Sequence, residues 1–432
     1  MRVLGRWLLW GCILAGCALG CGKDTGPFAA AAADLESARK DAREAGVPLS
    51  RTDVDARLGD SALYAKARAA FDDAAEAVGE GWVLPRDRRL YSKEELPRVE
   101  AALGRFRVAE GLLKRALATG PWASSPGAGP ALRRIVRIYV AEARLAVAKH
   151  DPPGFAECLG AIIELAEHVA QQPGVTAQTT GYDIVNEAFR LTESILGVTN
   201  GDPALAKAAL GQLSRPMMPL DLRRGYATLP LESLDTLRKN PISAGIQANV
   251  ASWELPNGSS VPDKAQAAID EFGGMSQDLA ARAMEARHWR FWLSVYGGLA
   301  RAKTFEEQAQ AYDMAVKELE TDAQTNPLSL IYLASWLPTN PLTLEYVAQL
   351  EDQRVASIMG VKILAEGRRK ASDTELSQLK ARGLACEEQD GGFVIQRNLD
   401  PNADPFTSVD PTLFAFPERR RVSFVRQALT PR

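Results

Sequence analysis

The chain has 432 residues, of which 46% are hydrophobic and 24% are charged, and its formal net charge is −3. This composition is typical of globular proteins and excludes a disordered or collagen-like chain. The 51 basic and 54 acidic residues are mixed along the sequence with no basic stripe, so we do not expect nucleic acid as a partner.

The N-terminal segment has the pattern of an export signal. Arg2 and Arg6 precede a run from Trp7 to Gly16 that contains only apolar residues and glycine. This run is too short to span a bilayer, which needs about 20 apolar residues. A transmembrane interpretation would have to continue through Cys21 and end at Lys23, which gives at most about 16 residues. We therefore prefer the export signal.

The run ends in Leu14-Ala15-Gly16-Cys17. This tetrapeptide resembles the lipobox of bacterial lipoproteins. The resemblance implies that residues 1–16 are removed, that the Cys17 sulfur receives a diacylglyceryl group, and that the new amino terminus is acylated. Two or more acyl chains anchor a protein stably, whereas one chain binds only marginally. Cys21 is the alternative attachment site, with a poorer match because alanine stands where the leading leucine would be.

Helical periodicity dominates the rest of the chain up to about residue 380. After a glycine-rich lipidated tether over 17–27, we expect three helical regions, at 28–118, 131–253 and 264–382, separated by low-complexity loops at 119–130 and 254–263. The predicted helices are Ala30–Glu44, Ala62–Val78, Lys93–Leu117, Ala131–Lys149, Phe155–Gln171, Ala177–Leu196, Pro203–Leu213, Asp221–Leu237, Lys264–Phe272, Gln277–Tyr296, Phe305–Thr321, Pro327–Leu337 and Leu344–Gly367.

Proline positions refine two of these helices. Asp202 and Pro203 have the pattern of an N-cap followed by proline at the first helical position. Pro230 must kink or divide the predicted helix Asp221–Leu237, because proline lacks the N–H that a helix interior needs.

The C-terminal region, 383–432, has a different pattern. Ala385–Gln389 and Phe393–Arg397 are strand-like and flank a glycine turn, which predicts a β-hairpin followed by an extended tail. No repeat of 34 or about 40 residues is evident. The sequence therefore predicts a mainly all-α fold, an irregular helical bundle or α-solenoid, with a small C-terminal β-hairpin.

Parts of the body resemble a group of uncharacterised helical bacterial envelope proteins. The similar stretches are His150-Asp151, FAECLGAIIELAEHVAQQPGV and DIVNEAFRLTESIL, together with Gly392-Phe393-Val394 and Asp404-Pro405-Phe406 near the end. They cover about a third of the chain. Because that group has no established activity, the resemblance implies a location and a helical body but no mechanism.

The sequence lacks the common catalytic motifs, including Gly-x-Ser-x-Gly, His-Glu-x-x-His, Cys-x-x-Cys and phosphate-binding glycine loops. Glu285 and His288 have the spacing of a di-iron ligand pair, but no second such pair accompanies them. Ser37 and Lys40 have the Ser-x-x-Lys spacing without its companion motifs. We therefore expect no metal and no cofactor.

The cysteines of the body leave one question open. A single disulfide could join two of Cys21, Cys158 and Cys386, and the helical pattern around Cys158 favours packing of that residue in the core.

An aromatic and basic cluster, RHWRFWLSVYGG, is the one candidate binding surface. It contains Arg287, Trp289, Arg290 and Trp292 at helical spacing. Core packing is the default interpretation, and the functional alternative is a surface that binds a glycan or a partner helix.

We expect a lipid-anchored protein of the bacterial cell envelope, facing the periplasm or the exterior. Its expected role is binding or scaffolding with an envelope protein or glycan partner. One alternative is an envelope hydrolase without a recognisable motif, which would need a pocket holding two carboxylates of raised pKa. The other is a tethered solute- or glycan-binding protein, which would expose Trp289 or Trp292.

Overall fold

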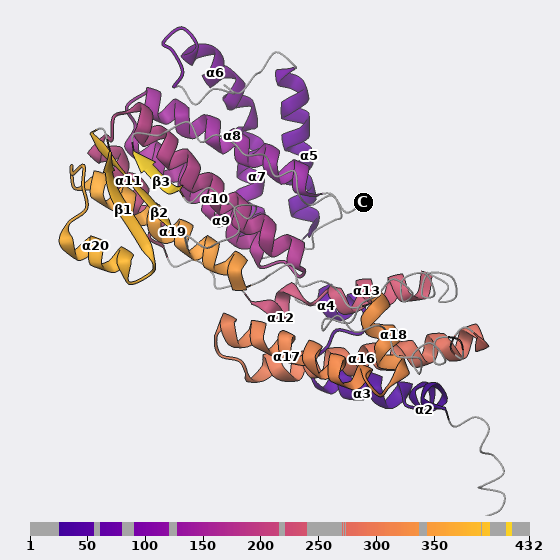
Figure 1. Cartoon of the computed structure of the whole chain (residues 1–432). Helices are drawn as coiled ribbons and strands as arrows, with labels where there is room; N and C mark the ends of the chain where they lie inside the picture. The colour runs from indigo at the N-terminus through magenta and orange to yellow at the C-terminus, as the bar shows by residue number, and fades with distance from the viewer. Residues whose placement is uncertain are drawn as a thin grey trace, which may run out of the picture. The chain divides into compact units, whose positions relative to one another are not determined.

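We analysed a computed structural model that describes residues 26–55, 61–79, 90–120, 128–215, 221–239, 270, 272, 274–336, 344–389, 391–397 and 412–416. The chain forms two compact units, each built from two separate stretches of sequence (Figure 1). Unit 1 comprises Met1–Ala56 and Asp221–Pro341, and unit 2 comprises Arg57–Leu220 and Leu342–Arg432.

These units do not follow the predicted division of the chain. Each of the predicted regions 28–118, 131–253 and 264–382 is shared between both units, and neither loop, 119–130 or 254–263, falls at a unit boundary. The loops were chosen for their composition, but a unit is defined by which helices pack together.

Unit 1 is arranged around one long helix, α16, which packs against α2, α3, α13, α17 and α18. The elements of the unit are α2 (Pro27–Ala33), α3 (Leu35–Glu44), α4 (Arg51–Asp55), α12 (Leu222–Gly225), α13 (Leu229–Lys239), α16 (Gln277–Arg301), α17 (Phe305–Ala323) and α18 (Pro327–Trp336).

Local sequence explains where these helices begin. Ser276 caps α16 through the Leu279 N–H, and Thr304 and Glu307 form a reciprocal capping box at the start of α17. The helix predicted over Asp221–Leu237 is divided into α12 and α13, with Pro230 in the first turn of α13, as its missing N–H requires. The predicted helix Lys264–Phe272 lies almost entirely outside the described residues.

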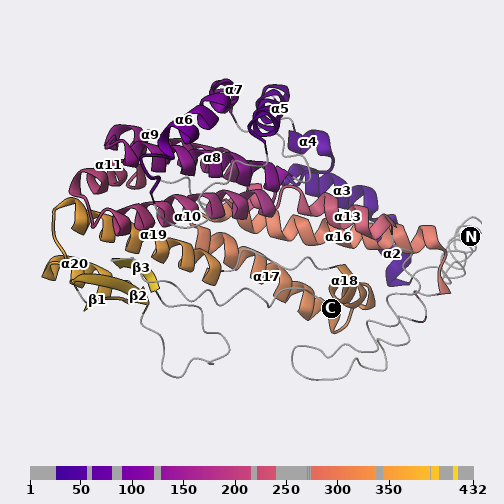
Figure 2. The ribbon, with the colours of Figure 1, turned by 90° about the horizontal axis from the view of Figure 1, so that it is seen from above.

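Unit 2 contains the larger core, in which the long helices α8, α9, α10 and α19 lie together (Figures 1 and 2). Its helices are α5 (Ser61–Val78), α6 (Leu96–Leu103), the 3₁₀ turn η1 (Gly104–Phe106), α7 (Arg107–Leu117), α8 (Ala128–Ala148), α9 (Pro152–Ala170), α10 (Val175–Val198), α11 (Pro203–Leu213), α19 (Leu344–Ala365) and α20 (Asp373–Lys380).

A glycine allows α10 to pack closely against α9 in this core. A Cβ at Gly181 of α10 would lie 2.7 Å from the Ala166 carbonyl oxygen of α9, so glycine is needed there. The predicted cap of α11 is confirmed, because Asp202 Oδ1 accepts from the N–H groups of Ala204 (2.8 Å) and Leu205 (3.3 Å).

The C-terminal sheet has three antiparallel strands in the order β1 (Leu384–Gln389), β2 (Gly392–Arg397) and β3 (Thr412–Phe416). The predicted hairpin is confirmed as β1 and β2. The predicted extended tail contains the additional strand β3, which packs on α19 and α10. Side chains satisfy its outer edge, since Glu193 Oε1 accepts from the Ala415 N–H at 3.0 Å and Gln353 donates to the Leu413 carbonyl at 2.6 Å.

The mainly all-α fold predicted from the sequence is thus confirmed, with a sheet one strand larger than the expected hairpin. Among the described helices, none combines the length and the apolar character needed to cross a membrane.

Candidate functional site

The aromatic cluster proposed as a binding surface is part of the core of unit 1. Trp289 is 2% exposed and Trp292 is fully buried. Trp292 packs against Tyr226, Phe291 and Tyr296, and the Trp289 indole N–H donates to Glu285 Oε1 at 3.1 Å. Because helices surround α16 on several sides, its aromatic face is covered. The structure therefore agrees with core packing, the default interpretation of this cluster, and the alternative of an exposed aromatic surface is wrong for Trp289 and Trp292.

The two arginines of the same cluster are bound to carboxylates. Arg290 donates to both oxygens of Asp34 at 2.9 Å and to Asp41 at 2.6 Å. Arg287 forms an ion pair with Asp322 at 3.2 Å. The Arg290 contacts fasten α2 and α3 to α16, and Arg39 donates from Nε (2.9 Å) and Nη2 (2.5 Å) to the same oxygen, Oε1, of Glu285.

Glu285 and His288 do not form half of a metal site. His288 is fully buried, and its Nε2 lies 2.7 Å from the Pro230 carbonyl oxygen, so this nitrogen carries the proton. Its Nδ1 then accepts from the Tyr332 hydroxyl at 3.1 Å. Within the part of the chain that the structure describes, no group of three or more His, Cys, Asp or Glu residues could hold a metal ion.

The cysteines divide into two groups. Cys17 and Cys21, the alternative lipid attachment sites, lie outside the described residues. Cys158 and Cys386 are half-buried free thiols. Cys158 packs at the edge of the unit 2 core beside Phe155 and Leu159 of the same helix, which agrees with the packing role predicted from its helical pattern.

Two glutamates that sequence analysis did not single out form the most unusual titratable site. Glu110 of α7 and Glu142 of α8 are half-buried, and each affects the pKa of the other. Burial, followed by the negative charge of Glu110, raises the pKa of Glu142 to about 8, and burial also raises the pKa of Glu110. The pair therefore holds a proton at neutral pH.

The surroundings of this pair are also neutral. Burial raises the pKa of the Tyr139 hydroxyl and of the Cys158 thiol, and the nearby glutamates raise both further. Arg107 is the cation that lowers the pKa of both glutamates, and it does not outweigh burial. The sequence carried a signal for Glu110. This residue lies on the same face of its helix as the apolar residues Phe106, Leu113 and Leu117.

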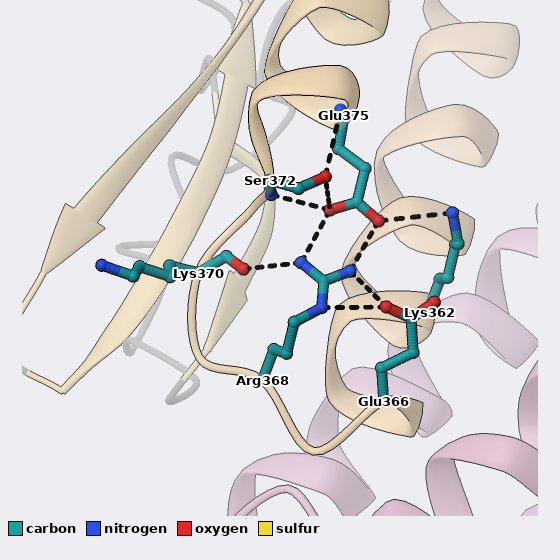
Figure 3. Close-up of polar contacts among 6 residues, drawn as sticks. All are labelled: Lys362, Glu366, Arg368, Lys370, Ser372 and Glu375. Atoms are coloured by element: carbon teal, nitrogen blue, oxygen red, sulfur yellow. Dashed lines mark hydrogen bonds and ion pairs between the residues drawn. The ribbon is translucent and has the colours of Figure 1, made fainter.

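A second glutamate site, at the corner between α19 and α20, has the opposite chemistry (Figure 3). Glu375 accepts from Arg368 Nη1 at 2.8 Å and Nη2 at 2.7 Å, from the N–H and hydroxyl of Ser372 at 2.9 Å each, and it contacts Lys362 Nζ at 3.3 Å. The Arg368 guanidinium, ahead of the other donors, lowers the pKa of Glu375 to about 2. Arg368 also binds Glu366, at 2.9 and 2.5 Å. The network ties the end of α19 to the start of α20.

No protein-family model, curated protein or solved structure matches this chain.

Proposed function

We propose that this protein is a lipid-anchored protein of the bacterial cell envelope that acts by binding or scaffolding. The observation that carries the proposal is Leu14-Ala15-Gly16-Cys17 at the end of a short apolar run preceded by Arg2 and Arg6. Cys21 remains the alternative attachment site.

The contacts of the first helices support an anchoring role for the N-terminal segment. α2 begins at Pro27, about ten residues after Cys17, and α2 and α3 are fastened to α16 through Arg290 and Arg39. Ten residues reach about 35 Å when fully extended and about 17 Å on average as a flexible chain. A lipid on Cys17 would therefore keep unit 1 close to the bilayer surface.

The pairing of polar side chains supports binding over catalysis. The arginines of the predicted cluster, Arg287 and Arg290, are held by carboxylates, and Glu375 is occupied by an arginine, a lysine and a serine. Such groups stabilise the fold and position helix surfaces, and none of them is held ready for a reacting substrate.

The anchor is tested by intact-mass analysis of protein extracted from membranes with detergent. We expect a chain that starts at Cys17 and carries the mass of a diacylglyceryl group and an acyl chain. Cys17→Ser should abolish the added mass, and Cys21→Ser should leave it unchanged. The reverse pattern would assign the alternative cysteine, and a chain with both cysteines unmodified would refute the anchor.

The binding role is tested by mild-detergent purification of the anchored protein from its own membranes. A partner recovered in constant ratio, identified by mass spectrometry, would support a scaffold. A protein that is always recovered alone would remove the main support for that role.

A carboxyl-dependent hydrolase is the second candidate function, favoured by the half-buried pair Glu110 and Glu142, whose pKa values are both raised. A carboxyl with a pKa near 8 can donate a proton at neutral pH, and two carboxyls that share a site are a known catalytic arrangement. Glu142→Gln should then lower the turnover of any substrate found in a glycan and peptide screen by at least about a hundredfold. Glu157→Gln, which changes an exposed carboxylate of α9, is the matched control.

A further inference from the structure

The segment from η1 to the end of α8 has an unbalanced charge. Between Gly104 and Ala148 the chain contains two acidic residues, Glu110 and Glu142, and eight basic residues: Arg105, Arg107, Lys114, Arg115, Arg133, Arg134, Arg137 and Arg144. The chain as a whole has a net charge of −3, so this excess is local.

Folding increases this imbalance at the surface. The only two acids of the segment, Glu110 and Glu142, are half-buried, and burial raises the pKa of both. All the basic residues of the segment except the half-buried Arg144 are exposed. The described residues of η1, α7 and α8 thus expose seven cations, whereas both of their carboxyls are partly covered. The balance of 51 basic and 54 acidic residues over the whole chain was a misleading signal, because it hid this local excess.

Few of these cations are neutralised by their neighbours. Arg134 forms an ion pair with Asp72 of α5, and Arg105 donates to the Ala77 carbonyl at 3.2 Å. The other five form no ion pair with any carboxylate of the described residues; they are Arg107, Lys114, Arg115, Arg133 and Arg137. Their positive charge is available to a partner.

The outward face of α7 has a specific shape and composition. Arg107, Val108, Gly111, Lys114 and Arg115 recur at intervals of three to four residues and so lie on one side of the helix. Val108 is 74% exposed, more than any other large hydrophobic side chain among the described residues. Gly111 has no neighbour within 4 Å of the position of a Cβ. Val108 and the basic side chains therefore project into solvent around the uncovered backbone at Gly111.

We propose that this exposed basic face of α7, with Arg107, Lys114 and Arg115 around Val108, binds the anionic headgroups of a phospholipid bilayer. Basic side chains on an amphipathic helix are attracted to anionic lipid, and an exposed apolar residue among them can enter the headgroup region. A duplex nucleic acid would not use the exposed valine. The choice of a bilayer as partner rests on the proposed lipid anchor. The charge distribution on α7 is independent of that anchor.

The test uses the chain from residue 17 onward with Cys17 and Cys21 changed to serine, which contains every described residue and has no lipid. Its binding is measured by co-sedimentation with vesicles of pure phosphatidylcholine and with vesicles that contain about 30% phosphatidylglycerol. We expect binding only to the anionic vesicles, and a steep loss between about 50 and 500 mM salt because surface charges are screened.

The basic face is tested by a variant with three substitutions: R107Q, K114Q and R115Q. A basic residue near an anionic surface contributes roughly fivefold to the binding constant, so the variant should bind about a hundredfold more weakly. The matched control removes the same number of exposed basic residues elsewhere: K207Q, K303Q and K317Q. It should lose less than about tenfold. Thermal unfolding checks that both variants keep the fold.

Three results would overturn the proposal: equal binding to both kinds of vesicle, an equal loss in the control variant, or tighter binding to duplex DNA than to anionic vesicles at the same salt. These outcomes are separable from failure of the anchor. Unmodified Cys17 and Cys21 in the native protein would refute the anchor alone, since the vesicle experiment uses no lipidated protein.

Discussion

The α7–α8 pair and the α19–α20 corner both bury glutamates, and they leave them in opposite charge states. Glu375 is 3% exposed and ionised, with a pKa lowered to about 2 by Arg368, Ser372 and Lys362. Glu142 is less completely buried, yet its pKa is raised to about 8. The number of donors around a carboxyl, and not its depth alone, decides its charge.

The difference has consequences for the surface of unit 2. At the α19–α20 corner two carboxylates, Glu375 and Glu366, balance the charge of two cations, Arg368 and Lys362, and the four hold a turn together. At α7–α8 burial raises the pKa of both carboxyls, and seven cations of η1, α7 and α8 remain exposed. One arrangement stabilises a corner, and the other creates an unbalanced basic face.

Glu375→Gln should have the largest effect on this comparison. The amide cannot accept the paired bonds of Arg368, and the half-buried Arg368 guanidinium loses its buried partner, so we expect the free energy of unfolding to fall by about 2–3 kcal/mol. Urea denaturation at pH 7 measures the change. Glu366→Gln, which removes the more exposed carboxylate of the same arginine, is the control and should cost less than about 1 kcal/mol. Equal losses would show that the donors around Glu375 do not matter.

Gly360→Ala should have an intermediate effect, because it tests how tightly α19 packs against β3. A Cβ at this position in α19 would lie 2.4 Å from the Phe414 ring of β3, and we expect a loss of about 2 kcal/mol. Gly111→Ala in the open face of α7 is the contrast. It should raise the free energy of unfolding by about 0.5–1 kcal/mol, since alanine favours a helix and meets no neighbour. Opposite signs in chemical denaturation are the expected result.

Glu142→Gln should have the smallest effect and should depend on pH. Glu142 binds a proton in the folded state up to about pH 8, but it titrates near its ordinary value of 4.5 in the unfolded state. The folded state therefore binds more protons between these values, so its stability falls as the pH rises from about 4.5 to 8. The amide does not titrate, and we expect the variant to be more stable than the wild type by about 1 kcal/mol at pH 9 and similar to it at pH 4.5.

Thermal unfolding at the two pH values measures this difference, with Glu157→Gln as the exposed control. Glu375 has the opposite sign, because its lowered pKa contributes stability above about pH 4.5 that is lost as the pH falls toward 2. A variant Glu142→Gln that is less stable than the wild type at pH 9 would contradict the raised pKa of Glu142.

Local sequence was sufficient to predict most helices. The cap formed by Asp202 before Pro203, the break at Pro230 and the glycine turn between β1 and β2 depend on a few adjacent residues, and the structure has each of them. β3 was not predicted, because Thr412–Phe416 becomes a strand only by pairing with β2 and packing on α19. The candidate site was equally hidden, since neither Glu110 nor Glu142 is unusual until α7 and α8 bring them together.

The amino-acid sequence by itself thus determined most of the helices and the mainly all-α class, because hydrophobic period, caps and prolines act over one or two helical turns. Tertiary structure alone decided which helices pack around α16, that each unit combines two distant stretches, and which side chains of η1, α7 and α8 stay exposed. These features depend on which faces pack together, and side chains far apart in the sequence set that choice.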